Sequence, residues 1–145
     1  MRVEKQNKTY PLLPFSQLVF NMTRWTPWVY MFESRWCLHS QKKELQRIES
    51  AIVQVLNHHP VFNMHVDTHG YQSYQSSPAT MKGQYYAVRL WTKGEDVYCR
   101  FRWSRILGDG KSMYIFFENV IRAYRGEELP PDEYLTYLDE QSHIQ

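Results

Sequence analysis

The sequence predicts a two-layer α/β sandwich of the α+β kind, in which helices pack on one side of a mostly antiparallel sheet. The first observation behind this prediction is the order of patterns along the chain, which runs helix, strand, helix, several strands, helix, helix. The second is that successive strand patterns in the middle of the chain are separated by short turns, which is typical of antiparallel hairpins. The third is that 43% of the residues are hydrophobic and 16% aromatic, enough to build a core and to argue against disorder.

Length and charge narrow the class of protein. The 145 residues suit one domain or one lobe of something larger. With 17 basic and 15 acidic residues, the net charge of +2 is too balanced to predict binding to nucleic acid or to a membrane surface. No apolar run approaches the roughly 20 residues of a membrane span. The first residues also lack the apolar segment of a signal peptide. We therefore expect a cytoplasmic protein.

The two cysteines, Cys37 and Cys99, lie far apart in the sequence, and each sits in a strand-like run. This placement favours two buried free thiols in a reducing compartment over a disulfide.

The first half of the chain predicts two helices around one long strand. The apolar residues of each helix recur at steps of three and four, and the strand is rich in aromatic and branched residues. The predicted elements, in order, are a flexible N-terminus at 1–9, an extended entry at 10–14, a short helix at 15–22, a strand at 28–38 and a helix at 41–58 with Ser40 as its N-cap.

The second half predicts two hairpins followed by two helices. The first hairpin pairs 61–67 with 71–75, and the second pairs 84–91 with 97–103. A helix over 113–124 then ends at Gly126. Asp132 is expected to cap a last helix that turns Leu135 and Leu138 inward.

A sharp turn, residues 103–110, joins the last predicted strand to the clearest predicted helix. Gly108 and Gly110 permit the backbone angles of a tight reversal. Asp109 is placed to accept hydrogen bonds from the free N–H groups at the start of the helix. Such a corner is either purely structural or a place where a reactive group is presented.

Two familiar kinds of site are not expected here. A phosphate-binding loop over 108–112 would need a glycine at the position of Arg105. The histidines at 58, 59, 65 and 69 match no common zinc spacing, so we expect no metal site and interpret His58 and His59 as favourable charges at a helix C-terminus. The acidic residues near the C-terminus are interpreted as a solvated helix face: Asp132, Glu133, Asp139 and Glu140.

Three segments together resemble the N-terminal half of a condensation domain from nonribosomal peptide synthetases. Residues 10–17 (YPLLPFSQ) are similar to the opening "YPLTPAQ" stretch, and 51–62 are similar to the helix and "RHPALRT" signature of that family. Residues 104–110, with the following helix and 134–135, align with the "HHxxxDG" motif and its surroundings. The resemblance implies a chloramphenicol-acetyltransferase-like fold, with 10–145 as one condensation-like N-terminal lobe. A full member has two such lobes with a tunnel between them.

The departures from the family motif concern its chemistry. In the family the second histidine of the motif is thought to assist attack by the acceptor amine. Here Ser104 and Arg105 occupy the two histidine positions, and a guanidinium stays protonated near neutral pH, so it is no ordinary general base. The family's structural aspartate and turn glycine are matched by Asp109 and Gly110. The arginine that usually pairs with that aspartate is replaced by Asn63.

Two further residues match the family, one in the "RHPALRT" signature and one in the turn of the "HHxxxDG" motif. His59 matches the histidine of the second motif, and Gly108 lies within the third. The resemblance therefore implies a retained fold with degenerate chemistry.

Three hypotheses follow. The first is a condensation-like lobe, inactive alone, that serves as an interaction or scaffold module or as a piece of a larger synthetase. Its expected partners are a C-terminal lobe, a second copy or a carrier protein. The second is half of a two-lobe acyltransferase, which would use thioesters of coenzyme A or of a phosphopantetheinyl carrier protein, and which has no cofactor of its own. The third is an unrelated α/β binding module. A lone lobe is also expected to expose apolar surface that a partner would cover.

Overall fold

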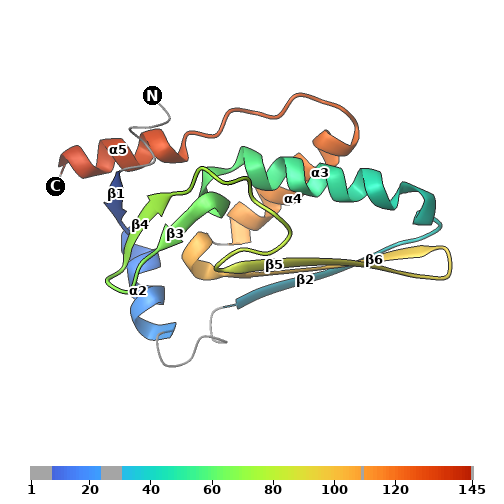
Figure 1. The fold of residues 1–145 in the computed structure, drawn as a ribbon, viewed down its shortest axis with the longest axis horizontal. Helices are drawn as coiled ribbons and strands as arrows, with labels where there is room; N and C mark the ends of the chain where they lie inside the picture. The colour runs from blue at the N-terminus through green and yellow to red at the C-terminus, as the bar shows by residue number, and fades with distance from the viewer. Residues whose placement is uncertain (1–7, 24–30, 109, 145) are drawn as a thin grey trace.

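Two three-stranded antiparallel sheets and four α-helices make up the part of the chain that the computed structural model describes, residues 8–23, 31–108 and 110–144 (Figure 1). The strands of the larger sheet have eight or nine residues and those of the smaller sheet three or four. The helices cover one face of the larger sheet and flank the smaller one (Figure 1). The predicted fold class, helices against antiparallel sheet, is confirmed. Its division into two separate sheets goes beyond the prediction.

The larger sheet has the order β2-β6-β5, so β6 lies in the centre. Its strands are β2 (Met31–Leu38), β5 (Tyr86–Lys93) and β6 (Asp96–Ser104). Alternate residues of β6 are buried, as a strand with one face toward a core requires. The hairpin predicted to pair 84–91 with 97–103 is confirmed, since β5 and β6 are antiparallel neighbours and Lys93 pairs with Asp96 at the tip.

Helices α3 (Leu45–His58) and α4 (Gly110–Tyr124) lie across one face of the larger sheet (Figure 1). Helix α3 buries the apolar stripe that its periodicity predicts. Helix α4 does so only in part, because Phe116 is buried whereas Ile121 of the same predicted stripe is 48% exposed. The main core beneath them contains the largest fully buried side chains, among them Trp103, Phe101, Phe116 and Leu56.

The smaller sheet has the order β1-β4-β3, and two further helices pack beside it. These elements are β1 (Thr9–Pro11), β3 (Met64–Val66), β4 (Tyr71–Tyr74), α2 (Pro14–Thr23) and α5 (Tyr134–Ile144). The predicted inward residues of α5 are confirmed, because Leu135 and Leu138 are buried in a cluster with Tyr10 and Met64. None of the described helices has the length and apolar character that crossing a bilayer requires.

Two local predictions are wrong. Ser40 does not cap the helix that follows, because it adopts a φ of +57° and a 3₁₀ turn, η1 (Lys42–Glu44), comes before α3. The strand predicted from residue 61 begins only at Met64, because Pro60 starts a second 3₁₀ turn, η2 (Pro60–Asn63). The first three residues of the strand predicted over 28–38 lie outside the described residues.

The two cysteines are free, as predicted, but only Cys99 is buried. Burial raises the pKa of the Cys99 thiol to about 11. Cys37 is exposed, so the prediction that it is buried is wrong. The alternation of side chains along β2 shows which residues share a face with Cys37, but it does not show which face the helices cover, and this one is turned away from them.

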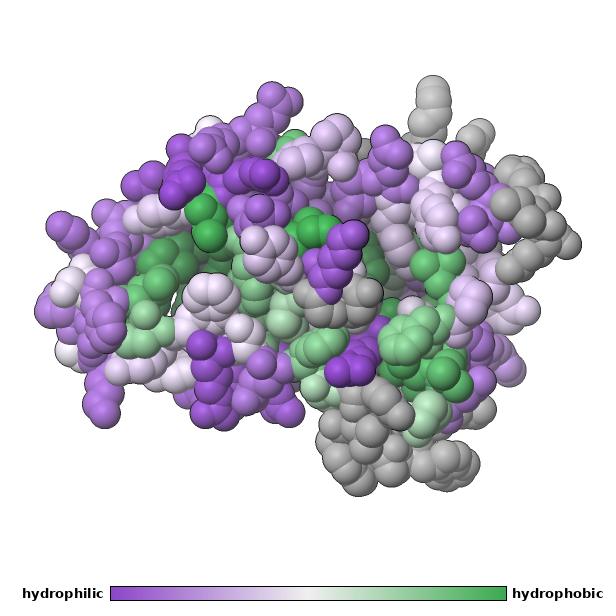
Figure 2. All heavy atoms as spheres, turned by 180° about the vertical axis from the view of Figure 1, so that it is seen from behind, coloured by the Kyte–Doolittle hydropathy of each residue, from purple (hydrophilic) through white to green (hydrophobic). Residues whose placement is uncertain are grey.

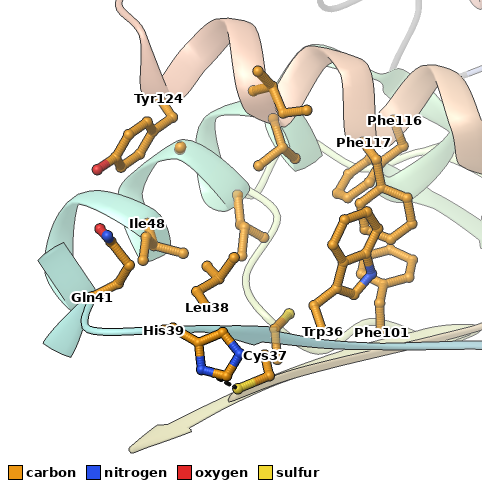
Figure 3. A pocket seen from close by; sticks show the side chains of 15 residues that line it. Trp36, Cys37, Leu38, His39, Gln41, Ile48, Phe101, Phe116, Phe117 and Tyr124 are labelled. Carbon is orange, nitrogen blue, oxygen red and sulfur yellow. Dashed lines mark hydrogen bonds between the residues drawn. The ribbon is translucent and has the colours of Figure 1, made fainter. Parts of the chain in front are cut away.

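An apolar cavity of about 610 Å³ separates the helices from the sheet near the end of β2. It is lined mostly by aliphatic and aromatic side chains, including Trp36, Leu38, Ile52, Phe117 and Val120 (Figure 3). Figure 2, which shows the opposite side of the molecule from Figure 1, shows a hollow lined by apolar side chains at this end. We call this space the distal cavity, since it lies at the opposite end of β6 from the turn at 104–110.

Candidate functional site

The corner between β6 and α4 holds the motif positions singled out in the sequence. Ser104 ends β6 and is 4% exposed. Its Oγ accepts a hydrogen bond from the Ile106 N–H at 3.2 Å and so caps a 3₁₀ turn, η3 (Arg105–Leu107). On the other side of this turn, Ser16 of α2 donates to the Ile106 carbonyl at 2.8 Å. Two serine hydroxyls, from Ser104 and Ser16, thus hold the backbone of Ile106 in the turn.

Arg105 is a cation packed on an aromatic ring. Its guanidinium carbon lies 4.5 Å from the centroid of the Phe32 ring, within the range of a cation–π contact. A guanidinium donates hydrogen bonds and accepts none, so this side chain can hold an anion but cannot remove a proton.

The glycine at position 108 is required by the backbone. Its φ is +153°, and a Cβ there would lie 2.8 Å from the Cβ and Oγ atoms of Ser112. Gly110 is the first residue of α4. Asp109 lies outside the described residues, so its predicted contact with the helix N-terminus stays a prediction.

A cavity of about 360 Å³, which we call the corner cavity, opens beside this turn. Gly108, Ser112 and Trp103 line it from the corner, and Ser16 from α2. His59, from the end of α3, also lines it, and its side chain is 13% exposed. An imidazole therefore lies near the motif, although it does not come from the motif's own histidine positions.

A chain of hydrogen bonds determines the tautomer of the neutral imidazole. Arg122 Nη1 donates to Asn119 Oδ1 at 3.1 Å, which turns the Asn119 amide nitrogen toward His59. That nitrogen lies 3.0 Å from His59 Nε2, and an amide N–H can only donate, so Nε2 is the acceptor. The proton of the neutral ring is therefore on Nδ1, which donates to Asp132 Oδ2 at 2.5 Å.

Asp132 completes this network and also starts the last helix. Its other carboxylate oxygen accepts the Tyr134 N–H at 2.8 Å, which confirms its predicted place at the start of α5. Burial alone would raise the pKa of the Asp132 carboxyl. The hydrogen bonds from His59 and the Tyr134 backbone, together with the nearby histidines, outweigh that effect and hold the pKa below its usual range.

The interpretation of the C-terminal acidic residues as a solvated face is wrong for two of them. The Asp132 side chain is only 17% exposed and is bound to His59. Asp139 accepts hydrogen bonds from the Tyr10 hydroxyl at 2.8 Å and from the Lys8 ammonium at 3.2 Å. Burial, with the nearby Asp139 carboxylate, raises the pKa of Tyr10 to about 12.

The predicted residues are thus only partly brought together. Ser104, Arg105 and Gly108 share the corner, and His59 lines its cavity. Asn63 is not part of it, because its amide donates to the Ser77 carbonyl at 3.0 Å. Asn119 was missed. The signal that could have found it is an amide three residues after Phe116, on the buried stripe of a predicted helix.

Both ring nitrogens of His59 are engaged, so the arrangement as it stands offers no free general base from this residue. The corner cavity provides serine and tyrosine hydroxyl groups, an indole and a small volume. This chemistry suits binding better than proton abstraction.

Solved structures of other proteins share the fold of this chain, although their sequences differ widely from it. No protein-family model and no curated protein matches the sequence. The starter condensation domain of the rhizomide synthetase RzmA superimposes with a TM-score of 0.74 at 14% identity, over 96% of this chain and 44% of that one. The cyclization-docking bidomain of EpoB from Sorangium cellulosum gives 0.74 at 13% identity, over 100% and 37%.

A third solved structure contains a partner protein. The X-domain in complex with OxyB, from teicoplanin biosynthesis, gives a TM-score of 0.75 at 14% identity, over 94% of this chain and 38% of that one. The chain therefore has the fold of a lobe of a condensation domain, as the resemblance implied. It spans less than half the length of each of these three proteins.

Proposed function

We propose, from the premise that this chain has the fold of a condensation-domain lobe, that it is a non-catalytic member of a larger assembly related to nonribosomal peptide synthesis. In this proposal residues 10–145 are one condensation-like lobe, which serves as an interaction or scaffold module or as part of a synthetase. The cytoplasmic location expected from the sequence remains part of the proposal.

The observation that carries the proposal is the chemistry at the two motif positions. Ser104 is buried and accepts the Ile106 N–H, so its hydroxyl belongs to the structure of the turn. Arg105 is a permanent cation on the face of Phe32. Neither group can take a proton from an attacking amine.

Exposed apolar residues support a partner. On α2, Phe15, Leu18 and Met22 recur at steps of three and four, and each is 45–54% exposed. A stripe of this kind on one helix face is typical of a surface that another chain or lobe covers. The proposed partner is a second lobe, in the same or in another polypeptide, or a second copy of this lobe. The X-domain bound to OxyB is a structural neighbour that docks a protein.

An acyl-transfer assay tests the inactivity. The 145-residue chain is incubated with acceptor amines and with thioesters of coenzyme A or of a phosphopantetheinyl carrier protein, and product is measured by mass spectrometry. We expect no turnover above the rate without protein, and none from the Arg105→Ala variant. Turnover by the wild-type chain that is lost in Arg105→Ala would contradict the proposal.

Light scattering tests the partner surface. We expect the chain to have a solution mass above that of the monomer, or to gain mass when a candidate carrier protein is added. Leu18→Asp should reduce the association, because it places a charge in the apolar stripe. Gln54→Asp, an exposed change on the outer side of α3, should leave it unchanged. A wild-type chain that stays monomeric with every candidate partner would argue against an interaction module.

The alternative function is half of a two-lobe acyltransferase that works without the usual motif histidine. The observation that favours it is the His59 imidazole in the wall of the corner cavity, which would have to give up its hydrogen bond with Asn119 to act as a base. Such an enzyme would take thioesters of a carrier protein or of coenzyme A and would need no cofactor of its own. The test is to add a second lobe of the same fold. Turnover that is lost in His59→Gln would favour the alternative, whereas none with any thioester donor would exclude it.

A further inference from the structure

Three metal-ligand side chains converge at the end of the larger sheet that lies farthest from the corner. They are Cys37 at the end of β2, His39 just after it and Asp96 at the start of β6. The Cys37 sulfur lies 3.8 Å from His39 Nδ1, and that nitrogen lies 3.6 Å from Asp96 Oδ2. All three ligand atoms lie within 4.8 Å of one another.

The sheet itself brings these residues together. Cys37 is the last residue but one of β2, and His39 is the first residue of the turn that follows the strand. The turn brings the imidazole back beside the thiol, on the face of the sheet that is turned away from the helices. The pairing of Leu38 with Val97 then places Asp96 beside residue 39. Figure 3 shows Trp36 and Leu38 directed toward the helices, while the side chains of Cys37 and His39 are turned toward each other.

The carboxylate is held in place by the backbone. Asp96 Oδ1 accepts the Ser40 N–H at 2.9 Å, which leaves Oδ2 directed at the imidazole. The turn is fixed further, because the Lys42 N–H donates to the Glu95 carbonyl at 3.0 Å. Two of the three ligands are thus tied to strands, and the third lies in a turn bonded to the β5–β6 hairpin.

We propose that Cys37, His39 and Asp96 form a binding site for a divalent transition metal ion of the zinc type. Thiolate, imidazole and carboxylate are all ligands of zinc, and three protein ligands leave a fourth position open to water or to a further ligand. At zinc–ligand distances of about 2.0–2.3 Å in a tetrahedron, neighbouring ligand atoms lie about 3.3–3.6 Å apart. The two distances to the imidazole, 3.8 and 3.6 Å, are within a few tenths of an ångström of this geometry, and the third pair, thiol to carboxylate, lies within 4.8 Å, so binding would draw those two side chains closer together.

The charges in the site also suit such an ion. A coordinating thiol loses its proton, so the thiolate and the carboxylate together balance a dication. The guanidinium groups of Arg35 and Arg100, which lie next along the same face, are turned toward Glu33, at 3.0 and 3.9 Å, rather than toward the site.

The geometry argues against a catalytic relay of the same three residues. In a Cys–His–Asp relay the thiol and the carboxylate bind different ring nitrogens of the histidine. Here both face Nδ1. The three donor atoms lie on the same side of the ring and within 4.8 Å of one another, which suits an ion bound among them.

The test uses Co²⁺ as a spectroscopic probe of the zinc site. The full chain, free of any histidine tag, is reduced, treated with chelator and titrated with Co²⁺. We expect one ion per chain, a thiolate-to-cobalt charge-transfer band, visible bands of tetrahedral cobalt, and loss of all of them when Zn²⁺ is added.

Variants assign the ligands. Cys37→Ser should abolish the charge-transfer band, and His39→Ala and Asp96→Asn should each weaken binding at least about tenfold. Asp96→Asn keeps an oxygen that can accept the Ser40 N–H, so the turn stays closed. At the same Zn²⁺ concentration, the melting temperature of the wild-type chain should rise by more than that of Asp96→Asn, which binds the ion more weakly.

Matched controls make the result decisive. His69→Ala removes an exposed histidine outside the cluster, and Cys99→Ala removes the buried thiol. Both should bind like the wild type. The proposal is overturned if the wild type gives no charge-transfer band, if Cys37→Ser retains it, or if either control loses it.

Discussion

The imidazole of His59 joins three parts of the chain that are far apart in sequence. It sits at the end of α3 and binds Asn119 of α4 and Asp132 before α5. A buried imidazole with both nitrogens engaged is a structural group, and its neutral tautomer follows from the orientation of the Asn119 amide. His59 is the imidazole that lines the corner cavity, and its hydrogen bonds connect the helices instead of leaving a nitrogen free for catalysis.

The Asp132 carboxylate should make stability depend on acid pH. Because its pKa is lowered in the folded state, its stabilising effect is present above the ordinary aspartate pKa of about 4 and is lost as the pH falls through the folded value. Asp132→Asn should therefore lower the free energy of unfolding by about 1–3 kcal/mol at pH 7. The difference from the wild type should narrow below about pH 4.

Urea denaturation at a series of pH values measures this difference. Glu133→Gln is the control, since that neighbouring side chain is exposed. A deficit in Asp132→Asn that stays constant down to pH 2 would show that the carboxylate charge is not the cause.

Among the elements, α4 has two contrasting faces. Phe116, on the inner face, is 1% exposed, and its ring centroid lies 4.7 Å from that of Phe101 and 5.3 Å from that of Phe62. On the outer face Tyr114 is 66% exposed. The helix is therefore held in place by its packing on the sheet, and its outer residues are available to a partner.

Substitutions on the two faces of α4 should differ sharply in their effect on the free energy of unfolding. Phe116→Ala should lower the free energy of unfolding by about 3–5 kcal/mol, because it removes a ring from the centre of an aromatic cluster and leaves a cavity. Tyr114→Ala should change it by no more than about 0.5 kcal/mol. Equal losses in chemical denaturation of the two variants would mean that α4 does not pack as described.

At the scale of the whole molecule, periodicity predicted most elements and the fold class. The helices over 15–22, 41–58 and 113–124 and the hairpin of the larger sheet follow from local patterns, which act over a few residues. The division into two sheets does not, because β1 pairs with β4 across about 60 residues of chain and no local signal records that pairing. The 3₁₀ turn over Pro60–Asn63 was missed for a related reason, since a short stretch with branched and aromatic residues, here Val61 and Phe62, also fits a strand.

For the candidate site, too, the sequence predicted the residues that are close together along the chain and missed contacts between distant ones. The motif located Ser104, Arg105 and Gly108 at the corner, because those residues are close together in sequence. The partners of His59 are 60 and 73 residues away, and the sequence alone does not show which polar residues meet in the fold. The outward direction of Cys37 depends on which face of the sheet the helices cover, and this too is decided only by tertiary packing.

The distal cavity has a practical consequence for work with this protein. Environment-sensitive dyes such as anilinonaphthalene sulfonate fluoresce in apolar hollows, and their binding is commonly taken as a sign of a loosely packed, expanded state. Here the properly folded chain should bind such a dye through the space of about 610 Å³ beside Trp36, with its near-ultraviolet circular dichroism intact. Ala51→Leu, which narrows that space, should reduce the signal. A bright sample at room temperature would then indicate a native hollow rather than a damaged preparation, and melting curves would be better followed by circular dichroism than by dye.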